Sequence, residues 1–224
     1  MKVIFVIPAR KDSKRLKNKN LKILNGKPLI YWTIIKAIKI KQFDKIIIST
    51  DSKKILCMEK EFKRYKKIKF IKRPKKYSKD TTPMKSVIIN VLNILKKEDS
   101  FEPSAIAILQ PTSPLRKVST IKRSIYRFIK KKPDFLTTIK EVRHNETPQM
   151  QFNLNKNQNS KKLNLKIRNK KRKYYVLDGG VIFIFNIKKN IFEIKGLGEF
   201  VEVKFPESID IDTKEDFDLA KKFI

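Results

Sequence analysis

The chain has 224 residues, a formal net charge of +33 at pH 7 and 40% hydrophobic residues, which is enough to bury a core and excludes a disordered chain. Its one cysteine, Cys57, excludes a disulfide framework, and its one histidine, His144, leaves too few soft ligands for a structural zinc site. No apolar run is long enough to span a membrane or to form a signal peptide. We therefore expect a cytoplasmic protein with no membrane partner.

The high positive charge has two interpretations. A basic surface can bind nucleic acid or an acidic membrane. Lysines are spread along the whole chain, however, together with many isoleucines and asparagines, which is typical of a compositional bias. The densest basic run, residues 161–173, is either a phosphate-binding patch or a solvated loop. We expect no nucleic-acid partner.

Short apolar runs alternate with amphipathic runs in the first part of the chain. The apolar runs predict buried strands over residues 3–7, 46–48, 68–71, 105–109 and 135–139. Runs that are apolar on one face predict helices over residues 28–40, 83–97 and 118–131. We expect Asp51 or Ser52 to cap a further helix after the second strand. This alternation predicts a mainly parallel sheet covered by helices on both faces, an α/β/α arrangement of three layers.

The pattern loosens after Glu141. Residues 153–173 are polar and weakly periodic, which is typical of a functional insertion, an interface or a disordered segment. Strands are predicted over residues 180–185 and 200–203, and a final helix is predicted over residues 213–224, capped by Asp212 or Thr213. We interpret residues 1–224 as one domain with an insertion at about residues 140–178.

A loop crowded with hydrogen-bond donors follows the first strand. Its cationic donors are Arg10, Lys14, Arg15, Lys17 and Lys19, and its neutral donors are Ser13, Asn18 and Asn20. Arginine and lysine suit phosphate oxygens, so a loop of this kind at the end of a parallel strand can surround a triphosphate. The alternative is an ordinary basic surface loop. The glycine-rich motifs of P-loop NTPases and dinucleotide-binding enzymes are absent.

Three further polar segments follow predicted strands. Gln110 to Arg116 form a proline-stiffened loop that carries Thr112 and Ser113, or else a plain strand-to-helix turn. The two carboxylates of Asp210 and Asp212 lie on one face of an extended segment, where they can hold Mg²⁺ or cap the last helix. The third segment carries Arg73, Asp80 and Thr82. Because parallel strands end at one edge, we expect the segments to line one crevice.

Together these motifs resemble those of the acylneuraminate cytidylyltransferases, and the resemblance runs nearly from end to end. The opening is similar to Ile-Pro-Ala-Arg-x-x-Ser-Lys followed by Lys-Asn, carried here by Arg10, Ser13, Lys14, Lys19 and Asn20. Later matches are the Gly-Lys-Pro-Leu-Ile, Ser-Thr-Asp, Gln-Pro-Thr-Ser-Pro-Leu-Arg and Ser-Ile-Asp-Ile-Asp-Thr motifs, at residues 26–30, 49–51, 110–116 and 208–213. The neighbouring Kdo cytidylyltransferases lack the Gln-Pro-Thr-Ser-Pro loop.

The resemblance implies a nucleotide-diphospho-sugar transferase-like fold and a reaction for surface glycan biosynthesis. CTP and an acidic nine-carbon 2-keto sugar would give the CMP-sugar and pyrophosphate, with Mg²⁺ or Mn²⁺ as the metal. The enzyme would be a homodimer built through residues 140–178. Arg10, Lys14 and Lys19 would hold the triphosphate, helped by Ser13, Asn20, Arg73, Asp80 and Thr82. The sugar would contact Gln110, Thr112 and Ser113, while Asp210 and Asp212 would hold the metal and one of them would help to deprotonate the sugar hydroxyl. Arg168 would match an arginine of the family.

The sequence departs from the family pattern at two places. Asp12 stands where the family has glycine, and Asp178-Gly179-Gly180 replaces its Asn-Gly, without the preceding arginine. These departures leave the sugar open, so that legionaminate or another relative is as credible as N-acetylneuraminate. Two alternatives remain: a nucleic-acid-binding protein on an α/β scaffold, and a sister nucleotidyltransferase that uses another nucleotide or a phosphosugar.

Overall fold

The computed structural model describes residues 1–143, 146, 152–154, 160–162, 173–188, 194 and 196–224. Arg168 and most of the basic run at residues 161–173 lie outside these residues. Within the described part of the chain, no helix combines the length and apolar character needed to cross a bilayer.

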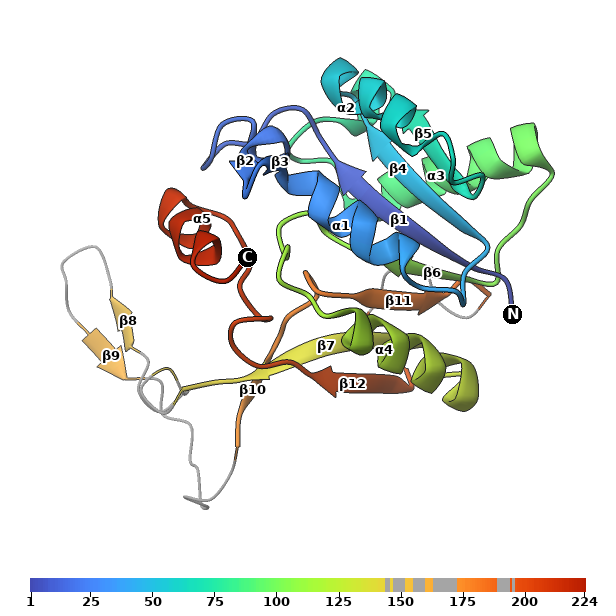
Figure 1. Ribbon diagram of the computed structural model, residues 1–224. Helices are drawn as coiled ribbons and strands as arrows, with labels where there is room; N and C mark the ends of the chain where they lie inside the picture. The colour runs from blue at the N-terminus through green and yellow to red at the C-terminus, as the bar shows by residue number, and fades with distance from the viewer. Residues whose placement is uncertain (144–145, 147–151, 155–159, 163–172, 189–193, 195) are drawn as a thin grey trace.

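The elements follow the alternation predicted from the sequence (Figure 1). The α-helices are α1 Leu29–Ile38, α2 Lys53–Cys57, α3 Met84–Asp99, α4 Val118–Lys131 and α5 Lys214–Lys221. The strands of the main sheet are β1 Val3–Ala9, β4 Lys45–Thr50, β5 Ile68–Lys72, β6 Ala105–Ile108, β7 Phe135–Glu141, β10 Tyr175–Leu177, β11 Phe183–Asn186 and β12 Gly198–Glu202. Short hairpins pair β2 Ile23–Leu24 with β3 Lys27–Pro28, and β8 Phe152–Leu154 with β9 Ser160–Lys162.

The main sheet runs in the order β10-β7-β11-β6-β1-β4-β5, and β12 also pairs with β7. β1 is parallel to both neighbours, with Phe5 opposite Ile46 of β4 and Val6 opposite Ile108 of β6. The chain therefore builds β4 and β5 on one side of β1 and then returns to place β6 on the other side. A strand order that reverses in this way opens a crevice at the carboxyl ends of the two strands.

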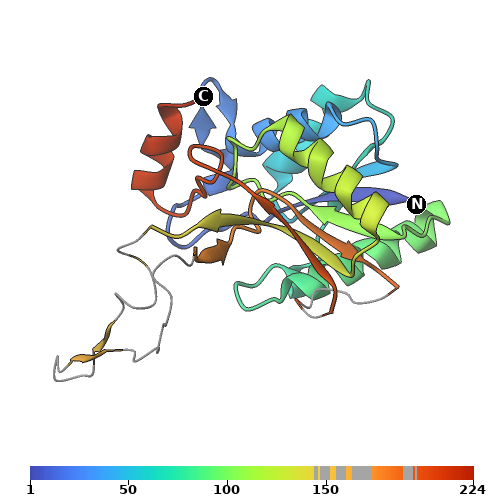
Figure 2. The ribbon, with the colours of Figure 1, turned by 90° about the horizontal axis from the view of Figure 1, so that it is seen from below.

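Helices cover both faces of the sheet, as the fold prediction required (Figure 2). Buried residues of α1, α2 and α4 pack on one face, with Phe5 and Ile7 of β1 among their contacts. Buried residues of α3 pack on the opposite face, against Ile4 and Val6. Because successive side chains of β1 point to opposite faces, its unbroken apolar run supplies both cores.

The sheet is not wholly parallel. β11 lies between β6 and β7 and is antiparallel to both, and β10 is antiparallel to β7. The predicted class, a three-layer α/β/α fold with a mainly parallel sheet, is confirmed. The direction of β11 was not predicted, because an apolar run that is buried on both faces reads the same in either direction.

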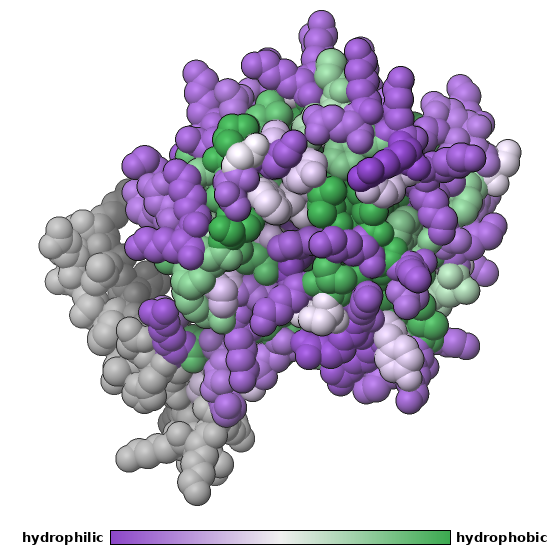
Figure 3. Space-filling model, in the orientation of Figure 1, coloured by the Kyte–Doolittle hydropathy of each residue, from purple (hydrophilic) through white to green (hydrophobic). Residues whose placement is uncertain are grey.

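Hydrophilic side chains are spread over most of the face seen in Figure 3 rather than gathered into one stripe. Patches of hydrophobic residues lie between them.

Candidate active site

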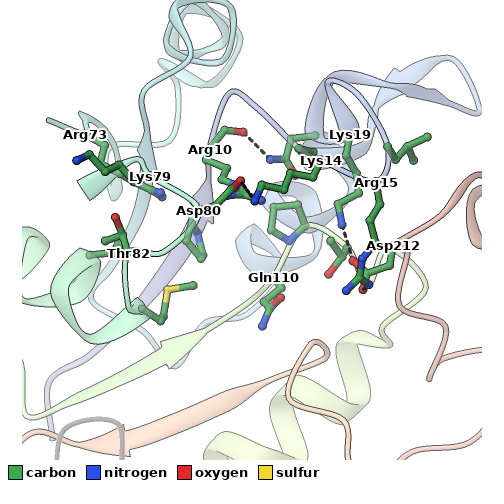
Figure 4. Close-up of a pocket in the computed structure, with 18 of the residues that line it drawn as sticks. Arg10, Lys14, Arg15, Lys19, Arg73, Lys79, Asp80, Thr82, Gln110 and Asp212 are labelled. Atoms are coloured by element: carbon green, nitrogen blue, oxygen red, sulfur yellow. Dashed lines mark hydrogen bonds and ion pairs between the residues drawn. The ribbon is translucent and has the colours of Figure 1, made fainter. Parts of the chain in front are cut away.

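A cavity of about 420 Å³ lies at the carboxyl edge of the sheet, beside the point where the strand order reverses (Figure 4). It is lined by residues at the end of β1, by residues of the loops after β1, β5 and β6, by the start of α3 and by one residue from the segment before α5. The sequence predicted the following lining residues: Arg10, Ser13, Lys14, Lys19, Asn20, Arg73, Asp80, Thr82, Gln110, Thr112 and Asp212. Residues as far apart in the sequence as Arg10 and Asp212 thus meet in one hollow, as expected for loops at one edge of a parallel sheet.

Internal hydrogen bonds fix the loop after β1. The side-chain amide of Asn20 is buried and donates to the backbone oxygen of Arg10 at 3.0 Å. Leu16 is buried in a small apolar cluster with residues of α5, and its backbone oxygen accepts from the backbone N–H of Lys19 at 3.1 Å. Asn18 has a left-handed backbone with φ of 54°, which asparagine tolerates better than most residues. The loop therefore presents its cations from a defined backbone.

Arg10 and Lys14 converge on the carboxylate of Asp80 (Figure 4). The Lys14 Nζ lies 2.8 Å from Asp80 Oδ2, and the guanidinium of Arg10 forms an ion pair with Oδ1. The Asp80 side chain comes from the loop between β5 and α3. An anionic group thus already sits between two cations of the kind that bind phosphate. Asp80, predicted to bind the nucleotide, is placed here as the internal partner of these cations.

A second cluster joins the loop after β1 to the segment before α5. Lys19 Nζ donates to Asp212 Oδ1 at 2.9 Å and to the backbone oxygen of Ile211 at 2.7 Å. Arg15 Nη1 donates to Asp212 Oδ2 at 2.6 Å. The Lys19 side chain is only 13% exposed, which strengthens its interaction with Asp212.

Arg73 forms the wall of the cavity on the β5 side. Its Nη2 donates to the backbone oxygen of Ser49 at 2.7 Å, and its Nε donates to the Ser49 hydroxyl at 3.2 Å. Burial lowers the pKa of Arg73 to about 10, an effect that Asp51 opposes, so the guanidinium stays charged at neutral pH. The two hydrogen bonds to Ser49 of β4 thus fix the position of the Arg73 side chain.

The loop after β6 contributes Gln110 and Thr112 to the cavity. Ser113, which was predicted to contact the sugar, is completely buried, and its hydroxyl donates instead to Asp210 Oδ1 at 3.4 Å. Asp210 lines a second hollow, of about 670 Å³, whereas Asp212 lines the first cavity. The structure therefore places the two carboxylates in the walls of two different hollows rather than in one shared crevice.

Among the described residues, six cationic side chains line the first cavity, from Arg10, Lys14, Arg15, Lys19, Arg73 and Lys79. The carboxylates that this part of the chain contributes to the lining are those of Asp80 and Asp212. Anionic ligands are attracted to such a positive, concave surface. For a metal ion, the described residues offer no cluster of three or more His, Cys, Asp or Glu side chains. Asp210 and Asp212 suit the hard cation Mg²⁺, which commonly takes one or two carboxylates together with substrate phosphates.

Sequence reasoning missed several residues that the structure places at the site. Lys79 and Tyr77 line the cavity, and Arg15 was noted only as one of several basic donors. Arg116 was noted in a motif but given no role, although its side chain is completely buried beneath the Gln110 loop. Because arginine is rarely buried, no local signal in the sequence marked this side chain as part of the core. Arg168 lies outside the described residues, so its predicted role stays a prediction.

Comparison with known proteins relates the chain to one enzyme family. The profile of a family described as Cytidylyltransferase matches residues 4–223. An N-acylneuraminate cytidylyltransferase of Escherichia coli is 30% identical over 98% of the chain, and a CMP-N,N'-diacetyllegionaminic acid synthase of Legionella pneumophila is 37% identical over 56%. A pseudaminic acid cytidylyltransferase of Campylobacter jejuni is 33% identical over 70% of the chain and 65% of its own length. The chain spans about half the length of the first two relatives, 51% and 52%.

Solved structures share the fold over the whole chain. A CMP:2-keto-3-deoxy-manno-octonic acid synthetase in complex with CTP has a TM-score of 0.71 at 16% identity, covering 99% of this chain and 98% of that one. A 4-diphosphocytidyl-2C-methyl-D-erythritol synthase from Anaerococcus prevotii has a TM-score of 0.66 at 12% identity, with coverage of 99% and 96%. The match of the family profile to nearly all residues confirms the resemblance seen in the sequence. The chain belongs to the cytidylyltransferase family.

Proposed function

We propose that this chain transfers a cytidylyl group from CTP to an acidic nine-carbon 2-keto sugar, giving a CMP-sugar and pyrophosphate. The observation that carries the proposal is the meeting of Arg10, Lys14 and Lys19 with Asp212 in one cavity at the carboxyl edge of the sheet. The cations suit a triphosphate, and the carboxylate comes from the far end of the chain. Family membership supports the same reaction class.

In this proposal the chain acts mainly by positioning and by neutralising charge. Arg10 and Lys14 exchange Asp80 for phosphate oxygens, and Lys19 holds the pyrophosphate that leaves. Arg73 and Thr82 lie toward one end of the cavity (Figure 4), where the rest of the nucleotide fits. Cations that are fixed before the reaction stabilise negative charge as it develops on the leaving group.

The sugar approaches from the side of Gln110 and Asp210. Its anomeric hydroxyl forms the new O–P bond to the α-phosphate, and the bond from that phosphorus to the bridging oxygen breaks in line. The hydroxyl proton passes to one of the two carboxylates, Asp210 or Asp212. Mg²⁺ held by these carboxylates would supply further charge neutralisation on the phosphate oxygens.

The relatives indicate the class of sugar but not its identity. Their names specify N-acylneuraminate, N,N'-diacetyllegionaminate and pseudaminate, all of which are nonulosonic acids. Homologues at 30–37% identity support an acidic sugar of this type as the acceptor. The substrate panel described next identifies which of these three sugars the chain uses.

A substrate panel tests the proposal. The purified chain is mixed with each of the four NTPs, with Mg²⁺ or Mn²⁺, and with a set of nonulosonic acids and Kdo, while pyrophosphate release is followed. We expect release with CTP and at least one nonulosonic acid. Preference for another nucleotide would identify a sister nucleotidyltransferase, and no release with any nonulosonic acid would contradict the proposed reaction.

A further inference from the structure

Arg116 is the largest fully buried side chain of the described residues, with 0% of its surface exposed. It lies just after the Gln110 loop and before α4. A buried guanidinium is costly unless hydrogen bonds compensate for its lost hydration, so a buried arginine has a specific set of partners.

The partners of Arg116 are backbone oxygens from two separate segments. Its Nε donates to Ser113 at 2.9 Å, and its Nη2 donates to Gly180 at 3.1 Å and also to Gln110. One planar group thereby joins the start and the middle of the Gln110 loop to the turn between β10 and β11. Lysine offers a point charge on a flexible stem and cannot reproduce this forked geometry.

The same region holds the carboxylate segment before α5. The backbone N–H of Ile211 donates to the backbone oxygen of Thr112 at 2.8 Å, and the Ser113 hydroxyl donates to Asp210. A Cβ atom added at Gly180 would lie 2.5 Å from the Ser113 hydroxyl and 3.1 Å from Asp210 Oδ1, so the three segments are tightly packed. Movement of the loop therefore displaces Gln110 and Asp210 together.

Nearby carboxylates offset part of the cost of burying Arg116. Burial lowers the pKa of Arg116 to about 9, while the nearby carboxylates of Asp210, Glu207 and Asp178 act in the opposite direction. A second, half-buried cation supports the loop from α1, because Lys36 Nζ donates to the backbone oxygen of Pro114. The loop is thus held through its carbonyl oxygens by two cations that do not line the cavity.

We propose that Arg116 is a positioning residue for the acceptor sugar, because its guanidinium holds the Gln110 loop, the turn at Gly180 and the segment of Asp210 in one arrangement. This inference rests on the proposed function, since the loop and Asp210 form the sugar side of the site. The cations that hold the triphosphate belong to other loops, so loss of the guanidinium fork acts on the sugar and much less on CTP.

Arg116→Lys is the direct test, because it keeps the charge and removes the fork. We expect the KM for the best nonulosonic acid to rise about tenfold or more, since a small misplacement of a substrate-holding group has effects of this size. The dissociation constant of CTP, measured by calorimetry without sugar or metal, should change less than about threefold. A sugar KM within about twofold of the wild type, or equal rises for sugar and CTP, would overturn the inference.

Arg127→Lys provides a matched control. Arg127 lies on α4 and also donates to a backbone oxygen, that of Phe200, but on the surface. This variant should leave both constants unchanged. Val91→Ala, which truncates a buried side chain of α3, reports whether a general loss of stability alone raises the sugar KM.

If Arg116→Lys shows no cooperative melting, Lys36→Met decides. It removes the other cation that holds the loop, and we expect a several-fold rise in the sugar KM with CTP affinity retained; an unchanged sugar KM would overturn the inference. Absence of turnover by the wild-type chain with every nonulosonic acid would instead overturn the proposed function, and the sugar role of Arg116 with it.

Discussion

At the scale of single residues, Asp178 is a buried carboxylate in the turn before β11, where the family motif has asparagine. Burial raises its pKa from 3.8 to about 6, with Asp210 and Glu207 adding to the rise and Lys140 and Arg116 opposing it. Within the described residues its Oδ2 atom has no hydrogen-bond partner. The folded state therefore prefers the protonated form.

This preference predicts a pH-dependent effect of Asp178→Asn. Because the folded pKa lies above the unfolded one, the stabilisation by the protonated carboxyl is present below about pH 4 and is lost as the pH rises through about 6. Asparagine does not ionise, so the variant does not lose stability in this way. The unfolding free energy of the variant, relative to that of the wild type, should therefore rise between pH 4 and pH 7, by at most about 3 kcal/mol. Urea unfolding with a chelator present measures it. A constant difference between the two proteins would contradict the assignment.

At the scale of elements, the loop between β5 and α3 supplies a carboxylate that competes with phosphate. Asp80→Asn removes the anion between Arg10 and Lys14, so both cations become available without an exchange of partners. We expect pyrophosphate to bind several-fold more tightly to this variant, which calorimetry in metal-free buffer can measure. Weaker binding would show instead that Asp80 is needed to orient the two cations.

The beginning of α5 sets the position of the Asp212 segment. Thr213 and Asp216 form a reciprocal capping box, and the backbone N–H of Asp212 also donates to Asp216 Oδ2 at 3.0 Å. Thr213→Ala should lower the unfolding free energy by about 1 kcal/mol, whereas Thr213→Ser keeps the oxygen and most of the stability. Equal stability of the two variants in urea would show that the cap contributes nothing.

The sequence predicted the elements well because their signals are local. An unbroken apolar run such as that of β1 predicts a strand that is buried on both faces. Apolar residues on only one face of α4 predict a helix that packs against the core on that face. Ser52 caps α2 and Thr213 caps α5, each of them one of two candidates read from the sequence. Short-range hydrogen bonds of this kind depend only on neighbouring residues.

The arrangement of side chains at the site was less predictable because it depends on distant partners. The sequence places Ser113 in a polar loop, but only the packing of Gly180 and Asp210 turns its hydroxyl inward. Arginine is rarely buried, so nothing local marks Arg116 as a core residue. The pairing of Arg10 with Asp80 likewise needs two loops that only the sheet brings together.

At the scale of the whole molecule, β10 presents an apolar strand at the edge of the sheet. Tyr175, Val176 and Leu177 are 42%, 44% and 50% exposed, and among the described strands only β7 pairs with β10. Exposed edge strands readily pair with another chain. This surface supports the predicted homodimer through residues 140–178.

Light scattering after size exclusion tests the dimer. We expect a mass about twice the 26.5 kDa of one chain for the wild type, and Val176→Lys should shift it toward one chain by placing a charge on the edge. Tyr126→Lys is the control, because Tyr126 is 66% exposed on α4, away from this edge. A single-chain mass for the wild type would contradict the dimer.

The central claim is that the cations after β1 and a carboxylate near the end of the chain act on one nucleotide. The most direct measurement is the single-turnover rate of CMP-sugar formation by Arg10→Ala and Asp212→Asn, with melting curves for each. The controls are Lys11→Ala and Asp218→Asn, which lie outside the cavity lining. The account predicts that both site variants lose about 100-fold or more in rate while the controls and the melting curves stay near wild type. Near-normal rates in both site variants would contradict it.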